Sequence, residues 1–372
     1  MHPEQPIASP KLAVVGGGTG GHLFPGVAVA EAWLSLHPTG RVVFVGSERG
    51  IESNVVPALG YELVTVPTER LKNAGALERA RSLLRMPRAL WTARAVVSRL
   101  APDVVLGVGG FVSGPVVLAA ALSGLPCAVA EQNALPGLTN RLLARVVRRI
   151  YTAFPEAANR LPRAKVRPLG NPVRDAIRRA ASTAPESGAG RRVLVMGGSQ
   201  GARALNERLP AVFGALARRF PDLTVRHQAG RGNGESVRAR YADAGLKAAQ
   251  VDEFIDDVAG AVVAADLVVC RSGATTVAEL ACIGRPALFI PFPFAADDHQ
   301  AVNAASLVEV GAARMVREAE GTAERLETEL AELLASPARL AEMGRNARTR
   351  GRPDAAHTIA CDLTSLLEGS AP

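Results

Sequence analysis

Two glycine-rich turns hold the residues of this chain best suited to binding an anion. Gly16–Gly21 (Gly-Gly-Gly-Thr-Gly-Gly) is followed directly by His22, and Gly197–Gly201 (Gly-Gly-Ser-Gln-Gly) is followed by Ala-Arg. Glycine permits positive φ and lets a ligand approach free amides, and a helix N-terminus favours negative charge. Because each turn joins an apolar strand pattern to a helical one, the pair predicts two similar α/β halves around one ligand-binding cleft.

The elements that position these turns are predicted to form parallel sheets. Continuous Val/Leu runs indicate strands covered on both faces. They lie at 12–15, 42–45, 63–66, 104–107 and 127–130 in the first half, and near 193–196, 223–228, 267–270 and 287–290 in the second. In both halves an aspartate, Asp103 or Asp266, precedes a strand that ends in a glycine turn. We therefore expect an α/β fold of two Rossmann-like, doubly wound domains.

The domain boundaries follow composition. We expect an N-terminal domain over residues 1–168, a linker region over 169–190 rich in Pro, Gly, Ala and Arg, and a C-terminal domain over 191–353. Helices are expected at 324–335 and 338–348. A terminal amphipathic helix within 354–372 is expected to pack back on the first domain.

Composition limits the function. With 372 residues, 48% hydrophobic and 21% charged, the chain is long enough for two full cores, and its formal net charge of +8 suits an anionic partner. At 4% aromatic residues it lacks the stacking platforms of single-strand binders, so nucleic acid is disfavoured.

The four cysteines, Cys127, Cys270, Cys282 and Cys361, lack metal-ligand spacing and are predicted to be reduced and buried, which favours the cytoplasm. Glycines and prolines interrupt the uncharged run between Asp103 and Glu131, so we predict strands and a short helix there instead of a membrane span.

Several ligand classes stay open on residue types alone. The spacing of Gly16, Gly18 and Gly21 matches the dinucleotide fingerprint, but the acidic residue expected at the end of the second strand is replaced by Gly46-Ser-Glu48. A nicotinamide-dependent oxidoreductase and a non-enzymatic nucleotide-sugar-binding protein are the alternatives. No Gly-Lys-Ser/Thr follows either turn, and no Asp-x-Asp triplet occurs. We therefore expect no metal and no cofactor, with amides, helix dipoles and arginine neutralising any diphosphate.

Seven motifs, in order, resemble the MurG family of peptidoglycan N-acetylglucosaminyltransferases. They are Gly16-Gly-Gly-Thr-Gly-Gly-His22-Leu-Phe-Pro-Gly26, Gly109-Gly-Phe-Val-Ser-Gly114, Glu131-Gln-Asn133 with Gly137-Leu-Thr-Asn140, Gly170-Asn-Pro-Val-Arg174, Gly197-Gly-Ser-Gln-Gly-Ala-Arg203, Glu253-Phe-Ile-Asp256 and Arg271-Ser-Gly-Ala-Thr-Thr-Val-Ala-Glu279. The resemblance implies a GT-B fold and an inverting transfer from UDP-N-acetylglucosamine to undecaprenyl-pyrophosphoryl-MurNAc-pentapeptide, at the cytoplasmic face of the bacterial cell membrane. Ala130 stands where the family commonly has His, and Phe111 where Tyr is frequent.

The resemblance also implies site residues. On the donor side these are Ile255 for uracil, Glu279 for the ribose hydroxyls, Ser199, Ala274, Thr275 and Thr276 for the diphosphate, and Gln300 with Asn303 for the sugar hydroxyls. Thr19, Gly20, Gly21, Asn133 and Arg174 would close the cleft from the other side. His22 is our candidate general base, since an ordinary imidazole is largely neutral at physiological pH. Residue types alone leave open a capping role for His22 and surface ion pairs for Arg174 and Glu279.

A basic, apolar segment follows the third predicted strand. Its residues Arg81, Leu83, Leu84, Arg85, Met86, Arg88, Leu90 and Trp91 predict a patch that docks on an anionic phospholipid surface. A solvated helix face is the alternative.

Overall fold

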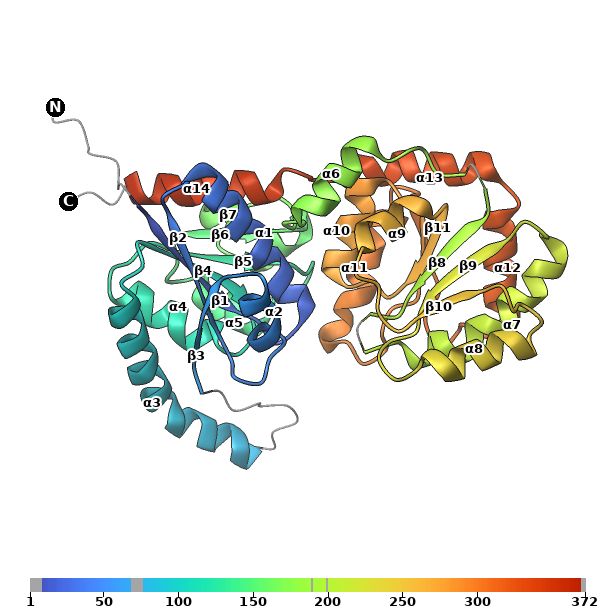
Figure 1. The fold of residues 1–372 in the computed structure, drawn as a ribbon. Helices are drawn as coiled ribbons and strands as arrows, with labels where there is room; N and C mark the ends of the chain where they lie inside the picture. The colour runs from blue at the N-terminus through green and yellow to red at the C-terminus, as the bar shows by residue number, and fades with distance from the viewer. Residues whose placement is uncertain (1–8, 68–75, 189, 199, 369–372) are drawn as a thin grey trace. The chain divides into compact units, whose positions relative to one another are not determined.

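The computed structural model describes residues 9–67, 76–188, 190–198 and 200–368, with the backbone alone for 76–86. The chain divides into two compact units (Figure 1). Unit 1 extends to Arg174 and also takes in the segment from Asp354 onward, whereas unit 2 comprises Asp175–Pro353.

Unit 1 is built on a parallel sheet of order β3-β2-β1-β4-β5-β6-β7. Its strands are β1 (Lys11–Gly16), β2 (Arg41–Gly46), β3 (Glu62–Thr65), β4 (Val104–Gly109), β5 (Cys127–Glu131), β6 (Arg149–Thr152) and β7 (Val166–Arg167). Its helices are α1 (Gly20–Leu36), α2 (Glu52–Ala58), α3 (Ala76–Leu100), α4 (Ser113–Leu122), α5 (Leu138–Leu143) and α14 (Ala355–Glu368), with 3₁₀ turns η1 (Pro155–Arg160) and η2 (Arg163–Lys165).

The last helix of the chain completes a core of unit 1. Ile359, Leu363 and Leu366 recur at helical spacing on α14 and are buried with Leu12 and Trp33 in one apolar cluster. In Figure 1, α14 crosses α1, against which it packs.

Unit 2 is built on a parallel sheet of order β10-β9-β8-β11-β12-β13. Its strands are β8 (Arg192–Met196), β9 (Thr224–Gln228), β10 (Gln250–Asp252), β11 (Leu267–Cys270), β12 (Ala287–Phe289) and β13 (Ala313–Met315). Its helices are α6 (Asp175–Thr183), α7 (Arg203–Arg219), α8 (Gly234–Asp243), α9 (Val258–Ala264), α10 (Ala274–Ile283), α11 (His299–Val308), α12 (Ala323–Leu334) and α13 (Pro337–Arg350), with a 3₁₀ turn η3 (Ala296–Asp298).

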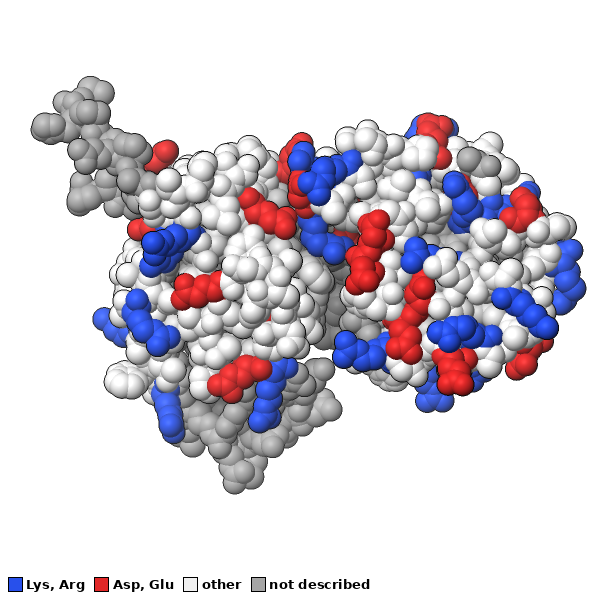
Figure 2. All heavy atoms as spheres, in the orientation of Figure 1, with Lys and Arg blue, Asp and Glu red and all other residues white. Residues whose placement is uncertain are grey.

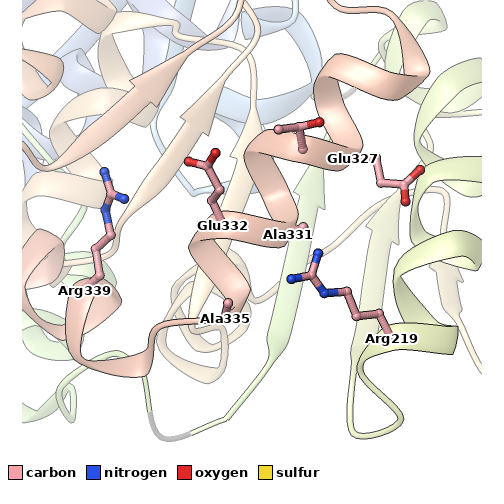
Figure 3. A pocket seen from close by; sticks show the side chains of 7 residues that line it. Arg219, Glu327, Ala331, Glu332, Ala335 and Arg339 are labelled. Carbon is pink, nitrogen blue, oxygen red and sulfur yellow. The ribbon is translucent and has the colours of Figure 1, made fainter.

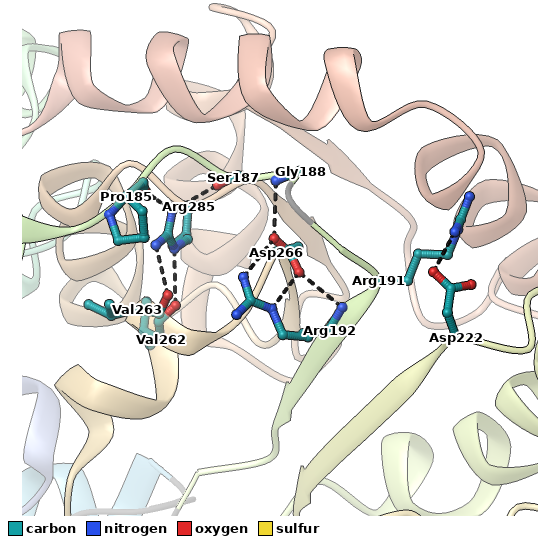
Figure 4. Close-up of polar contacts among 10 residues, drawn as sticks. All are labelled: Pro185, Ser187, Gly188, Arg191, Arg192, Asp222, Val262, Val263, Asp266 and Arg285. Carbon is teal, nitrogen blue, oxygen red and sulfur yellow. Dashed lines mark hydrogen bonds and ion pairs between the residues drawn. The ribbon is translucent and has the colours of Figure 1, made fainter.

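The two sheets share one strand order and one stabilising device. Counting strands within each unit, both begin with the order 3-2-1-4-5-6, so the predicted pair of Rossmann-like units is confirmed. The amide of Lys11, at the start of β1, donates to Asp103 Oδ2 at 2.7 Å, and that of Arg192, at the start of β8, donates to Asp266 Oδ2 at 3.1 Å (Figure 4). The aspartates noted in both halves of the sequence therefore join the first and fourth strands at the amino edge of each sheet.

Asp266 carries more partners than its counterpart. Arg192 also donates through Nε at 2.8 Å and Nη2 at 3.1 Å, and the amide of Gly188 donates at 3.1 Å. Burial alone would raise the pKa of Asp266, but the hydrogen bonds from Arg192 and Gly188 outweigh it and lower the pKa. The carboxylate is therefore charged although its side chain is fully buried.

The region expected to be a linker is partly helical. α6 occupies residues 175–183, with Ile177 and Ala181 buried one turn apart and Asp175 paired with two arginines. The following segment is held by Arg285, which is 1% exposed and donates to the carbonyls of Pro185, Val262 and Val263 and to Ser187 Oγ (Figure 4). α6 was not predicted, because too few apolar residues mark its buried face.

The uncharged run after Asp103 and the four cysteines were also predicted from the sequence. The uncharged run after Asp103 forms β4, α4 and β5 as predicted, and no helix among the described residues is long and apolar enough to cross a membrane. Cys127, Cys270 and Cys282 are buried, but the prediction was wrong for Cys361, which is exposed on α14 because it faces away from the apolar cluster. Acidic and basic side chains are interspersed on the visible face of unit 2 (Figure 2).

Candidate functional site

The glycine turns after β1 and β4 lie against each other at the carboxyl edge of the unit 1 sheet. Gly16, Gly17 and Gly18 have φ of +141°, +144° and +86°. The amide of Gly17 donates to the carbonyl of Gly109 at 3.3 Å, and a Cβ on Gly16 would lie 2.2 Å from that carbonyl oxygen. Only glycine fits this approach, which brings two turns that are far apart in sequence together.

His22 stands in the first turn of α1 beside both glycine turns. Its Nδ1 is 3.3 Å from Thr19 Oγ1. Its ring packs against Gly109, where a Cβ would lie 2.8 Å from His22 Cδ2. The imidazole and Gly20 are partly exposed, and the neighbouring Thr19 and Gly21 are exposed. This places a titratable ring at the strand end where ligands of open α/β sheets bind.

A buried carboxylate shapes the loop that carries Asn133. Glu131, at the end of β5, accepts from the amides of Asn133 and Gly137 at 3.0 Å each and from Asn140 Nδ2 at 2.9 Å. Burial raises the pKa of Glu131 against the effect of these hydrogen bonds. Glu131 and Asn140 belong to one of the motifs noted in the sequence, but no role was expected for them, because their contact depends on how the loop folds back.

The remaining unit 1 candidates lie near the same edge. The guanidinium of Arg174 stands 4.9 Å from the ring centroid of Phe24, which follows His22 by two residues on α1. Ala130, where the family commonly has His, is buried in β5 and packs in an apolar core. Phe111 is exposed.

The second glycine turn repeats the close approach in unit 2. Gly198 and Gly201 have φ of +79° and +73°, and a Cβ on Gly201 would lie 2.2 Å from the carbonyl oxygen of Ala229. A buried network supports this contact, since Asn206 Nδ2 donates to that carbonyl at 2.8 Å and its Oδ1 lies 3.1 Å from His227 Nε2. Ser199 lies outside the described residues.

α10 begins after β11, the strand that pairs with β8. Its N-terminus therefore lies at the same edge of the sheet as the glycine turn after β8. Ala274, Thr275 and Thr276 form its first turn, with Gly273 as N-cap. Amides in the first turn of a helix lack helical partners and favour negative charge. Glu279 lies further along α10 and is buried.

Hydrogen bonds hold the turn before α10 against α11. Ser272 Oγ donates to the carbonyl of Gln300 at 2.8 Å, and Asn303 Nδ2 donates to the carbonyl of Ser272 at 3.3 Å. Gln300 is partly exposed and accepts from the amide of Phe292 at 3.0 Å, whereas Asn303 is fully buried. Ile255 is also buried, with 2% exposure. In this conformation the side chain of Gln300 is accessible to a ligand. The side chains of Asn303 and Ile255 are buried in the interior of unit 2.

The basic, apolar segment forms part of α3. Arg88 and Trp91 are exposed and lie three residues apart on its outer face, and Trp91 is 75% exposed. Leu90 faces inward and packs on the unit 1 core. The side chains of Arg81, Leu83, Leu84, Arg85 and Met86 lie outside the described residues.

Unit 2 also has a surface depression that is separate from the glycine turn. Arg219, Glu327, Glu332 and Arg339 are among the residues of α7, α12 and α13 that line it (Figure 3). Arg219 is in the last turn of α7, which runs from the carboxyl end of β8 back to the start of β9. The depression is therefore at the amino edge of the sheet, away from the glycine turn.

Comparison with known proteins gives consistent relatives. The glycosyltransferase family 28 N-terminal domain matches residues 12–152, and the C-terminal domain of that family matches residues 192–359. A UDP-N-acetylglucosamine–N-acetylmuramyl-(pentapeptide) pyrophosphoryl-undecaprenol N-acetylglucosamine transferase of Myxococcus xanthus is 48% identical over 96% of this chain and 93% of its own length. A protein of the same name from Citrifermentans bemidjiense is 43% identical over 95% of this chain and 99% of its own length.

A solved structure leads to the same family. The crystal structure of Acinetobacter baumannii MurG superposes with a TM-score of 0.78 at 33% identity, covering 96% of this chain and 99% of that one. The predicted GT-B fold is thereby confirmed. The chain belongs to glycosyltransferase family 28 and, within it, to the MurG transferases.

Proposed function

We propose that this protein transfers N-acetylglucosamine from UDP-N-acetylglucosamine to the N-acetylmuramyl-(pentapeptide) pyrophosphoryl-undecaprenol acceptor of bacterial cell-wall synthesis. The observation that carries the proposal is the 48% identity to a transferase of that name over 96% of this chain. Neither a nicotinamide-dependent oxidoreductase nor a non-enzymatic sugar-binding protein has comparable support among these relatives.

In the proposed reaction, the 4-hydroxyl of MurNAc attacks the anomeric carbon of the donor sugar. A bond forms between that oxygen and the anomeric carbon, the bond from the anomeric carbon to UDP breaks, and the configuration inverts. His22 accepts the hydroxyl proton, and UDP leaves as an anion that keeps the electron pair of the broken bond. The contact of Nδ1 with Thr19 and the packing on Gly109 support this role, since a base acts only from a fixed position.

We assign the donor to unit 2. The amides of Ala274, Thr275 and Thr276, with Ser199, would neutralise the diphosphate as it leaves, because the dipole at the N-terminus of α10 favours negative charge. Glu279 would accept from the ribose hydroxyls, and Gln300 with Asn303 would hold the sugar hydroxyls. The uracil would meet the backbone of Ile255, because the side chain of Ile255 is buried. Binding at Asn303 requires either a side-chain rearrangement or action through Ser272, to which it donates.

We assign the acceptor to unit 1. From unit 1, Thr19, Gly20, Gly21 and Asn133 would also close the donor cleft. Asn133 would act from a loop that Glu131 holds by accepting from its backbone amide. Arg174, restrained over Phe24, would supply positive charge.

The acceptor's lipid anchor gives α3 a proposed role on the membrane. Trp91 is exposed on the same helical face as Arg88, opposite the buried Ala93, Val96 and Val97. An aromatic ring beside a cation suits the interface of an anionic phospholipid bilayer. We propose peripheral binding at the cytoplasmic face of the bacterial inner membrane.

Radiolabel transfer tests the proposed activity. Purified protein is incubated with labelled UDP-N-acetylglucosamine and a lipid-linked MurNAc acceptor, with UDP-glucose and UDP-N-acetylgalactosamine as competing donors. Label in the lipid fraction from UDP-N-acetylglucosamine supports the proposal. Binding of the donor without transfer would favour the sugar-binding alternative, and binding of NAD instead would favour the oxidoreductase.

A further inference from the structure

The first glycine turn of unit 1 encloses a carboxylate of the protein itself. Glu52, the first residue of α2, is 1% exposed. Its Oε2 accepts from the amide of Gly18 at 2.7 Å. Its Oε1 accepts from the amide of Ser47 at 2.9 Å and from Ser47 Oγ at 2.7 Å. Glu52 therefore joins the turn after β1 to the turn after β2.

Three glycines surround this side chain. A Cβ on Gly17, Gly46 or Gly50 would lie 2.5, 2.6 or 2.1 Å from the nearest Glu52 side-chain atom. Real Cβ contacts are essentially never below 3.0 Å. Among these three, only Gly17 has positive φ, so the space taken by Glu52 explains Gly46 and Gly50 better than backbone conformation does.

The surroundings favour the charged form of Glu52. Burial would raise its pKa, but the hydrogen bonds from the Gly18 and Ser47 amides and the Ser47 hydroxyl outweigh it, so the pKa is lowered. Backbone amides in turns bind anions, and here one amide from each of two turns converges on Glu52. The anion that these amides bind is supplied by the chain itself.

Two consequences follow for the turn. The amide of Gly18 is engaged by Glu52, so it is not offered to a dinucleotide pyrophosphate, although the glycine spacing matches that fingerprint. Gly18 also precedes Thr19, whose hydroxyl lies 3.3 Å from His22 Nδ1. The bond from Glu52 thus fixes the backbone next to the residue that contacts the imidazole.

We propose that Glu52 is a positioning residue for the transfer reaction, an internal anion that holds the turn Gly16–Gly21 in the shape that places Thr19 and His22. This inference rests on the proposed function of His22.

The first test uses Glu52→Ala with Glu48→Ala as control, since Glu48 is exposed. The wild-type rate is measured first, so that absence of any transfer counts against the proposed function and not against Glu52. We expect Glu52→Ala to lower kcat about tenfold or more, because the loop loses its anion, while the Kd for UDP and the rate of Glu48→Ala stay within about twofold of wild type. A Glu52→Ala rate within twofold of wild type overturns the inference.

Chemical rescue separates positioning by an anion from a general loss of structure. Formate fits the volume vacated by the carboxylate, so added formate should restore several-fold of the lost kcat, and chloride at equal ionic strength should not. A folded Glu52→Ala protein whose rate formate does not raise overturns the inference.

A second variant covers the case in which Glu52→Ala does not fold. Gly50→Ala leaves Glu52 present but puts a Cβ where its carboxylate lies, and it should lower kcat in the same way. Glu52→Gln, which sets an amide N–H against the Gly18 or Ser47 amide, should have an intermediate rate. Full rates in both variants overturn the inference.

Discussion

Replacing Gly109 with alanine tests whether the turn after β4 fixes the imidazole of His22. Gly109 has φ of +99°, and the new Cβ would lie 2.8 Å from His22 Cδ2 and 3.1 Å from His22 Nε2. The ring must therefore move by about 1 Å to reach an ordinary contact near 3.8 Å. The substitution acts on the ring without changing its chemistry.

Two effects with different magnitudes are expected. Alanine at positive φ costs on the order of 1 kcal/mol of folding stability. Displacing a reacting group by about 1 Å can lower the rate about 100-fold, equivalent to about 2.7 kcal/mol in the activation barrier. Stability should therefore fall modestly and kcat steeply.

A matched control separates these effects. Gly124 has φ of +82° but nothing within 4 Å of its Cβ position, so Gly124→Ala carries the backbone strain alone. The assay compares kcat by label transfer, and unfolding is followed by tryptophan fluorescence because both tryptophans, Trp33 and Trp91, belong to unit 1. Equal stability losses with a kcat defect confined to Gly109→Ala support the reasoning. A kcat for Gly109→Ala within threefold of that for Gly124→Ala would refute it.

Four further predictions concern other features. His22→Ala should lower kcat by about 100-fold to 10,000-fold without changing the Kd for UDP, measured by label transfer and calorimetry, and a full rate would remove His22 as base. Burial lowers the pKa of His227 to about 4, so unit 2 should keep its full stability above pH 6.5 and lose up to about 3 kcal/mol as the pH falls toward 4. Hydrogen exchange of β9 at pH 7.5 and pH 5, corrected for intrinsic rates, checks this, and unchanged protection contradicts it. Transfer should persist in excess EDTA, and loss of activity that magnesium restores would contradict the metal-independent scheme. Trp91→Ser should weaken sedimentation with anionic vesicles while leaving the Kd for UDP unchanged, and equal sedimentation of variant and wild type would argue against docking through α3.

The sequence predicted strands well where they are continuous apolar runs, and it missed strands that contain polar residues, such as β6 (Arg149–Thr152). β1, β4, β8 and β11 are continuous apolar runs, and each was placed to within about two residues. β7 and β10, with two and three residues, present no periodicity of their own and exist because parallel neighbours pair with them. The same limit hid α6, whose buried face rests on Ile177 and Ala181.

For the candidate site, motifs identified the residue types but not the supporting contacts. The glycine turns were predicted from spacing, and His22 became a candidate through its place after the first turn and the family resemblance. The aspartate correspondence led to a shared structural bond at the amino edges. Glu52 was not found, because a carboxylate 34 positions from Gly18 becomes its partner only when β1 and β2 lie side by side. The burial of Asn303 likewise depends on how α11 packs on the turn before α10.

The position of α14 has a consequence for the order in which the chain matures on the ribosome. Its apolar residues Ile359 and Leu363 finish a core begun by Leu12 and Trp33, yet all of unit 2 is translated in between. At about 5–20 residues per second, the nascent N-terminal half keeps an unfilled apolar groove for on the order of ten seconds or longer. Premature termination just before α14 would release a protein with a complete unit 2 and a unit 1 that exposes apolar side chains. Chaperones and proteases would recognise such a protein.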